Sequence, residues 1–204
     1  ASAGLKVVMV EKKKLGGVCL NEGCVPSKTL LQAAKTYHHA KHGSIFGVEA
    51  GSLSFDFGKA HAHKNSVMDR MRDGIAGLMK KHKVEVIEGE ATLVKGGFSV
   101  NGETHEAENI LLCTGSSPTI PPIPGIEAEH IVDSTGILNN ETLPENLVIV
   151  GGGVIGCEFA CVYASVGVPV TVLEAMPEIC PNLDSEISAI LRKELEKKGV
   201  AFVL

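Results

Sequence analysis

"NLVIVGGGVIGCEFACVYASVGVPVTVLE", from Asn146 to Glu174, is the stretch that decides the fold predicted for this chain. An apolar strand leads into a glycine turn, a helix follows, and a second apolar strand ends at Glu174. The turn has the spacing Gly151-x-Gly153-x-x-Gly156 between a strand and a helix, which is the context that a dinucleotide-binding unit requires. The alternative is a glycine-rich turn in an ordinary βαβ unit.

Each residue of this fingerprint has its own expected role. Gly151 makes the tight turn, Gly153 lets the backbone approach a pyrophosphate, and Gly156 lets the helix pack closely on the strand. Glu174 would accept from a ribose 2′-hydroxyl and repel a 2′-phosphate, so the pattern favours NAD over NADP. The residues expected at the NAD site are Gly151, Gly153, Val154, Ile155, Gly156, Glu158 and Glu174.

A second, partial copy of this unit opens the chain. "ASAGLKVVMVE", Ala1 to Glu11, lines up with "ASVGVPVTVLE", Ala164 to Glu174, and each copy predicts a glycine-capped helix end, a buried strand and an acid. The glycine turn of the first copy would then fall upstream of Ala1. After Glu174, a helix capped by Asp184 leads into a strand that stops at the last residue. We therefore expect two nucleotide-binding units, both incomplete.

The chain between the two copies predicts two helices and a small meander. Helices are expected over residues 26–42 and 57–82, followed by short antiparallel strands with Gly and Asn turns. The meander should return to the sheet at Ile110–Cys113. The predicted fold class is α/β, with a Rossmann-like FAD unit over 1–143 that carries the antiparallel meander, and the start of an NAD unit over 144–204.

Composition narrows the class of protein. In 204 residues, 44% are hydrophobic, only 4% are aromatic and 23 are glycines, which suits aliphatic strands joined by tight turns. The net charge of -5 offers no basic surface, so we expect no nucleic-acid partner. No apolar run is long enough to span a membrane and no secretory leader is seen. We expect a cytoplasmic protein. Because that compartment is reducing, its six cysteines are not expected to form structural disulfides.

Cys19 and Cys24 in "GGVCLNEGCVPSK", Gly16 to Lys28, are the candidate reactive groups. They could be a redox pair, half of a metal site, or two unlinked thiols. A structural zinc site needs a second ligand pair, and none is present, so zinc is disfavoured and no metal is expected. In a straight helix the two residues would point to different sides, too far apart for a disulfide.

The glycines and the proline of this motif supply the distortion that a disulfide needs. Cys24 would lie at the start of the helix that Pro26 opens, where free amides and the helix dipole lower the pKa of a thiol and favour a thiolate. Cys19, on the glycine side, would meet an external disulfide. Two unlinked buried thiols remain the alternative on these grounds.

Five histidines and a second pair of cysteines are not expected to bind metal or take part in catalysis. Five histidines beside lysines on helix faces predict solvated surface rather than a metal site: His38, His39, His42, His61 and His63. Cys157 and Cys161, one helical turn apart, predict small core residues.

The chain closely resembles the flavin-dependent pyridine nucleotide-disulfide oxidoreductases, and within them the dihydrolipoamide dehydrogenase branch. "GGVCLNEGCVPSK" is similar to the active-site pattern of the family, "TGSSP" from Thr114 to Pro118 to its second flavin motif, and "VIVGGGVIGCEFA" to its nicotinamide motif. The resemblance covers essentially the whole chain, in the right order.

The resemblance implies the following roles. Cys24 would be the thiolate in charge transfer with the flavin, Cys19 the interchange thiol, and Lys28 a neighbour of the flavin ring in a buried ion pair with Glu158. Electrons would pass from a dithiol through the cysteines to FAD and on to NAD. The implied FAD-site residues are Glu11 at the ribose, Lys12, Gly16, Gly17, Val18 and Cys19 along the pyrophosphate, Lys28, Ala91 at the adenine, and Thr114, Gly115 and Ser116.

The resemblance also implies partners and limits. The dithiol would be dihydrolipoamide or the lipoyl domain of a multienzyme complex, and the full-length parent would be a homodimer. The flavin's own glycine turn and the second half of the family's chain are not matched, so the 204 residues alone are expected to be inactive and to hold FAD weakly. A glutathione-type or mercuric reductase, and a non-catalytic NAD-binding or redox-sensing module, are the alternatives.

Overall fold

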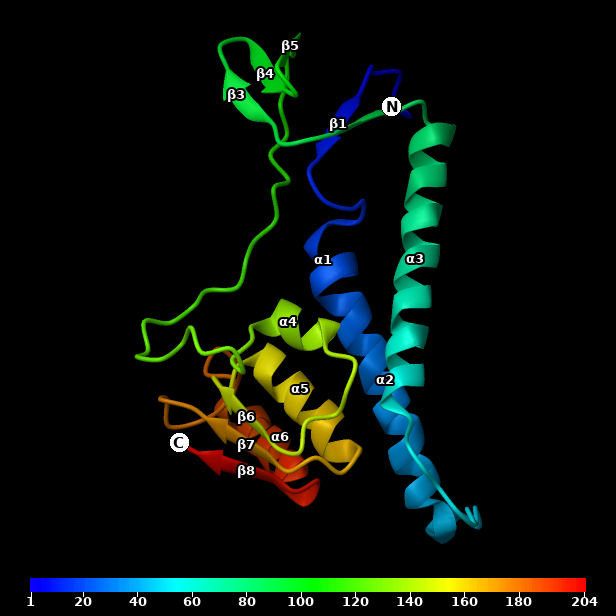
Figure 1. The fold of residues 1–204 in the computed structure, drawn as a ribbon, viewed down its shortest axis with the longest axis vertical. Helices are drawn as coiled ribbons and strands as arrows, with labels where there is room; N and C mark the ends of the chain where they lie inside the picture. Colours follow the sequence, from blue (N-terminus) through cyan, green and yellow to red (C-terminus); the bar gives the residue numbers. More distant parts are fainter.

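A parallel sheet of three strands carries the glycine fingerprint. In the computed structural model, which describes residues 1–204, its strands lie side by side in the order β6, β7, β8 (Figure 1). The elements of this unit are β6 (Leu147–Val150), α5 (Val154–Ser165), β7 (Val170–Leu173), α6 (Ser185–Lys197) and β8 (Val200–Val203). The βαβ unit predicted from Asn146 to Glu174 is confirmed.

The helices of this unit cover one face of its sheet. Crossovers between parallel strands are right-handed, and both crossovers advance by one strand in the same direction, so α5 and α6 lie on the same face. Along β6, Leu147 and Ile149 pack against the core, whereas Val148 and Val150 are 57% and 60% exposed. The sheet therefore has one covered and one open face.

The first unit is built on a shorter sheet. β1 (Val8–Glu11) pairs in parallel with β2 (Glu85–Glu88) only. The intervening chain forms α1 (Gly17–Glu22), α2 (Cys24–Lys41), the 3-10 helix η1 (Gly43–Phe46) and α3 (Phe57–Lys81). The two predicted long helices are confirmed, and α3 runs back alongside α2 (Figure 1).

The predicted meander is also present. β3 (Thr92–Val94), β4 (Gly97–Val100) and β5 (Glu103–Glu106) form an antiparallel sheet. Asn101 and Gly102, which join β4 to β5, have φ values of 51° and 83°. Positive φ at both central residues matches the twist of a two-residue hairpin, so the Asn-Gly pair explains this turn.

Two expectations for the first unit are wrong. Residues 110–113 form no strand, and Leu111 is 87% exposed. β1 is half-buried rather than buried. The glycine caps of the two copies do match: Gly4 N and Gly167 N donate to the carbonyls of Ala1 and Ala164, each at 3.0 Å, with φ values of 84° and 96°. A strand is stabilised by hydrogen bonds to its neighbours, and the β1–β2 sheet does not extend to residues 110–113.

One hydrophobic core joins the two units. Leu30 and Ala34 of α2 and Phe57 of α3 belong to the same buried cluster as Tyr163 of α5 and Val172 of β7. α5 packs beside α2, and α4 (Ser134–Asn139) precedes the second unit (Figure 1). The boundary between residues 143 and 144 stays a prediction. None of the helices is both long and apolar enough to cross a membrane.

His61 is an exception to the expected solvated histidines, because it is only 6% exposed. It packs with Lys64, which is 1% exposed and whose Nζ lies 2.9 Å from His61 Nε2. Lys64 Nζ also donates to the carbonyl of Leu138 in α4. Burial lowers the pKa of Lys64, an effect that the charge of Glu141 partly opposes. Lysines beside histidines predicted an exposed surface here, but His61 and Lys64 form a buried polar pair.

Candidate functional site

Cys19 and Cys24 lie on either side of a break between two helices. Cys19 is in α1, Cys24 is the first residue of α2, and Gly23 between the helices has φ -149° and ψ -110°. A Cβ on Gly23 would lie 3.3 Å from the carbonyl oxygen of Val18, so a larger residue would crowd the break. The distortion expected from the glycines is confirmed, and both thiols are free and exposed rather than buried.

The two thiols interact. Hydrogen bonding to Cys24 raises the pKa of Cys19 above its ordinary value, with smaller contributions from burial and from the charge of Cys24, while Lys28 acts in the opposite direction. Cys19 therefore keeps its proton to a higher pH than an isolated cysteine. The thiolate predicted at Cys24 requires that the proton of the pair stays on Cys19, and the raised pKa of Cys19 agrees with that prediction.

Replacing Cys24 with Ala is expected to make Cys19 more reactive. The substitution removes the largest cause of the raised pKa and the neighbouring charge, so more of Cys19 is thiolate at pH 8. We expect alkylation of Cys19 by iodoacetamide to accelerate by roughly threefold, measured by peptide mass spectrometry. Cys113→Ala, at an exposed cysteine outside the motif, is the control and should leave that rate unchanged. An equal or slower rate in Cys24→Ala would contradict the assignment.

Asn21 is a positioning residue that the sequence analysis did not single out for this role. Its Nδ2 lies 3.2, 3.1 and 3.0 Å from the carbonyl oxygens of Lys14, Leu15 and Gly17, so it holds the turn before α1. Its Oδ1 accepts from Arg72 of α3 at 3.0 Å. The sequence does contain a signal for this role. Asn21 lies between the two cysteines, on a helix of six residues that is too short to be stable without contacts from side chains.

Lys28 and Glu158 connect the two units. Lys28 Nζ on α2 lies 2.5 Å from Glu158 Oε1 on α5. The hydrogen bond to Glu158 raises the pKa of Lys28, and the charges of Glu158, Cys24 and Cys19 add to it. The predicted pair is formed, but it is not buried, because the side chains are 59% and 23% exposed. Lys28 thus carries a fixed positive charge close to the cysteines.

The glycine turn has the geometry expected of a phosphate cradle. Gly151 has φ 107°, and a Cβ on Gly156 would lie 2.2 Å from the carbonyl oxygen of Gly151. A Cβ on Gly153 would meet nothing within 4 Å, so the backbone there is open to a ligand. No side chain caps the start of α5, which leaves its first N–H groups available to an anion.

Glu174 holds this turn from the end of β7. Its Oε2 accepts from Gly152 N at 2.7 Å and its Oε1 from Met176 N at 2.8 Å. The hydrogen bond from Met176, followed by that from Gly152, lowers the pKa of Glu174 and keeps the carboxylate charged. Each oxygen keeps a second lone pair that a hydroxyl could use.

The predicted FAD-site residues are brought together only in part. Glu11 ends β1 and accepts from Lys13 N at 2.9 Å, and an ion pair of 3.1 Å joins Lys12 to Glu90, next to Ala91. Gly16 and Gly17 have φ 110° and 64°.

Gly115 lies close to the side chain of Val18 in α1. A Cβ on Gly115 would lie 2.8 Å from Val18 Cγ2. Thr114 and Ser116 are exposed, in a segment without regular structure. No side-chain hydrogen bond of these two residues links them to the other predicted FAD residues.

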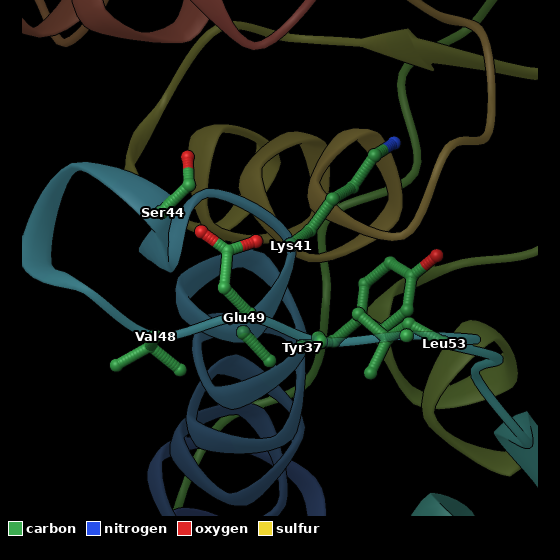
Figure 2. Close-up of a pocket in the computed structure, with 9 residues that line it drawn as sticks. Tyr37, Lys41, Ser44, Val48, Glu49 and Leu53 are labelled. Carbon is green, nitrogen blue, oxygen red and sulfur yellow. The ribbon is translucent and has the colours of Figure 1, made fainter.

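Two hollows lie along α2. One of about 400 Å³ is at its far end, lined by Tyr37, Lys41 and Leu53 among others (Figure 2). Lys41 is about 25 Å along the helix from Cys24, so this hollow is not part of the cysteine site. A larger one of about 830 Å³ lies between α2 and α3 and has Lys28 in its wall. No group of three or more His, Cys, Asp or Glu side chains has metal-binding geometry.

Comparison with known proteins gives a consistent result. All of residues 1–204 match the family described as pyridine nucleotide-disulphide oxidoreductase. The dihydrolipoyl dehydrogenase of Geobacillus stearothermophilus is 42% identical over 209 residues, which is 100% of this chain and 44% of that protein. The dihydrolipoyl dehydrogenase of Thermus scotoductus is 44% identical over 204 residues, covering 98% of this chain and 43% of that protein.

Solved structures show the same relationship. The HOCl-induced flavoprotein disulfide reductase RclA from Escherichia coli superposes with a TM-score of 0.85 at 33% identity, covering 100% of this chain and 44% of that one. LpdA from Mycobacterium tuberculosis gives a TM-score of 0.86 at 26% identity, over 99% of this chain and 46% of that one. The chain spans a little under half the length of these four relatives.

Proposed function

The chain belongs to the pyridine nucleotide-disulphide oxidoreductase family, and we propose that it carries the dithiol-exchange and nucleotide-binding residues of a dihydrolipoyl dehydrogenase. The observation that carries this proposal is the helix break at Gly23, which sets Cys19 beside Cys24 with Lys28 on the same helix. Dihydrolipoyl dehydrogenases about 40% identical over the whole chain support this branch over the glutathione and mercuric reductases.

The residues present fit NAD and part of an FAD site. Gly153 and the uncapped start of α5 would hold the pyrophosphate of NAD, and Glu174 its ribose. Val154, Ile155 and Glu158 follow on α5. On the other unit, Glu11 would hold the FAD ribose, and Lys12, Gly16, Gly17 and Val18 would line the pyrophosphate. Ala91, Thr114, Gly115 and Ser116 would complete the FAD site.

The cysteines would carry the exchange. A substrate thiolate attacks Cys19 in the Cys19–Cys24 disulfide, the S–S bond breaks, and Cys24 leaves as a thiolate beside the positive charge of Lys28. The second substrate thiol, on losing its proton, attacks its partner in the mixed disulfide and releases Cys19, which takes up a proton. One disulfide is formed and one is broken, so electrons balance. Bound FAD would accept the electron pair, and NAD would take it as a hydride.

Oxidised lipoamide tests the exchange in the 204-residue chain. Starting from the reduced chain, we expect a Cys19–Cys24 disulfide, which dihydrolipoamide should reverse. Cleavage after Glu22 places the two cysteines on separate peptides, so mass spectrometry detects the bond directly. Cys24→Ala should form no such link, whereas Cys113→Ala should behave as the parent chain.

The outcomes separate the candidate functions. A faster reaction with glutathione disulfide would assign a glutathione-type reductase. Oxidation by peroxide but not by lipoamide would assign a redox-sensing module. Binding of NADPH as tightly as NADH would contradict the role of Glu174. That the chain alone neither turns over nor holds FAD tightly stays a prediction, which a yellow purified chain oxidising dihydrolipoamide would refute.

The partners follow from the same proposal. The dithiol substrate would be dihydrolipoamide, free or on the lipoyl domain of a multienzyme complex, and the parent protein would act as a homodimer in the cytoplasm. Incubation with a reduced lipoyl domain in place of free dihydrolipoamide tests the first of these, with Cys24→Ala as the control.

A further inference from the structure

A second pair of cysteines lies directly beneath the glycine turn. Cys157 is in the first turn of α5, and Cys180 is in the loop between β7 and α6. Their sulfur atoms are 3.9 Å apart, and the residues are 5% and 3% exposed. Cys157 is a core residue, as its sequence pattern predicts, whereas no role is predicted for Cys180.

Both thiols contact the same carbonyl of the glycine turn. Cys157 Sγ lies 3.4 Å and Cys180 Sγ 3.6 Å from the oxygen of Gly152. The backbone N–H of Cys180 donates to the same oxygen at 2.9 Å. On the other side of this residue, Gly152 N donates to Glu174. The two sulfurs therefore help to fix the residue at the centre of the phosphate cradle.

The backbone at Cys180 has a conformation that is uncommon for a residue other than glycine. Its φ is 47°, in the left-handed region that non-glycine residues rarely adopt. Cys157, by contrast, is held in α5, where its N–H donates to Gly153. A disulfide requires the sulfurs to approach to about 2.05 Å. The loop around Cys180 is the part of the structure that can supply this shift.

We propose that Cys157 and Cys180 form a disulfide on oxidation by peroxide, and that this bond weakens nucleotide binding at the glycine turn. One sulfur, on losing its proton, attacks a peroxide oxygen; the O–O bond breaks, and a sulfenic acid and water form. The second sulfur displaces hydroxide from the sulfenic acid, and this hydroxide leaves as a second water. Two thiols and one hydrogen peroxide thus give one disulfide and two waters.

The bond removes the S–H protons that can donate to the Gly152 carbonyl or to the neighbouring sulfur, and it would pull the loop toward α5. Because S–H is only a weak donor, we expect a moderate effect, a fall of about tenfold in the affinity for NADH, or about 1.4 kcal/mol. This effect on binding rests on the proposed NAD site, whereas formation of the bond does not. Burial raises the pKa of Cys157 to about 12, so its oxidation should be slow compared with that of the exposed Cys19 and Cys24.

Mass spectrometry after cleavage at glutamate tests the bond itself. Cleavage after Glu145, Glu158, Glu174 and Glu178 places Cys157, Cys161 and Cys180 on three different peptides. In the chain treated with hydrogen peroxide, we expect the peptides of Cys157 and Cys180 to be linked with loss of two hydrogen atoms. Dithiothreitol should release them. Links to Cys161 at equal yield, or sulfinic acid at both positions without a link, would overturn the proposal.

Affinity for NADH tests the consequence. The measurement uses Cys19→Ala/Cys24→Ala, so that the exposed pair cannot contribute, with Cys180→Ala added as the matched control. Peroxide should weaken NADH binding about tenfold in the first variant and not in the second, with recovery on reduction. Unchanged affinity in a chain shown to be linked would overturn the regulatory part. Absence of NADH binding to the reduced chain would instead contradict the proposed nucleotide site, and a bond found in that chain would still stand.

Discussion

Replacing Gly156 with Ala is expected to destabilise the chain by about 3 kcal/mol and to abolish NADH binding. The added Cβ would lie 2.2 Å from the carbonyl oxygen of Gly151 and 3.2 Å from Ile149 Cγ2. The first of these contacts is with backbone, so it can be relieved only by moving the start of α5 away from β6. That shift would also open the phosphate cradle. Urea denaturation followed by circular dichroism measures the first effect, and NADH fluorescence the second.

Gly153→Ala is the matched control for this prediction. Its Cβ would meet nothing within 4 Å, and its φ of -71° suits alanine. Alanine is a poorer N-cap than glycine, so the free energy of unfolding should fall by about 1 kcal/mol or less. NADH binding should still be lost, because the methyl group would occupy the open space at which we propose that the pyrophosphate binds. Equal stability of the two variants would contradict the packing role of Gly156.

Replacing Lys64 with Ala is expected to cost about 3 kcal/mol of stability. The change leaves a cavity and removes the buried contacts of Nζ with His61 and with the Leu138 carbonyl. Lys59→Ala is the control, since Lys59 is 87% exposed on the same helix and should change stability by less than about 0.5 kcal/mol. A loss as small as that of the control would show that the buried pair does not stabilise the fold.

The same residue predicts a pH dependence. Burial lowers the pKa of Lys64 in the folded chain below 10.5, so the unfolded chain binds its proton more tightly. The contribution of Lys64 to stability therefore rises with pH from its folded pKa up to the unfolded value of about 10.4, and the cost is largest below that window. Lys64→Met, which keeps the stem but cannot titrate, should lack this rise. Parallel urea midpoints for both chains across pH 8 to 10 would contradict it.

The βαβ unit with its glycine turn could be predicted from sequence because local contacts determine it. Gly151, Gly156 and Glu174 act through contacts within one βαβ unit, so their spacing carries the information. The apolar stripe of α6 is covered only in part: Leu195 is buried, but Ile187 and Ile190 are 56% and 57% exposed. The neighbouring elements determine which residues of an apolar stripe are buried. The periodicity of the sequence predicts the stripe but not those neighbours.

The remaining errors have the same origin in long-range contacts. Ile110–Cys113 has strand composition, but a strand also needs an edge to pair with. Lys64, the buried partner of His61, donates to the carbonyl of Leu138 in α4, which is 74 residues away. The Cys157–Cys180 contact likewise spans 23 residues and a loop with irregular backbone. The Lys28–Glu158 contact was predicted only from the family resemblance. That resemblance implied a buried ion pair, whereas the two side chains are 59% and 23% exposed.

The core that crosses both units has a consequence for how the chain unfolds. Leu30, Ala34 and Phe57 lose their cover if α5 detaches, and Tyr163 loses its cover if α2 does. Neither half can then unfold while the other keeps its buried surface, so the two should melt in a single cooperative transition. A cut between residues 143 and 144 would not give two domains that fold independently. It would give two fragments with exposed apolar surface, and each would recover its structure only by binding the other.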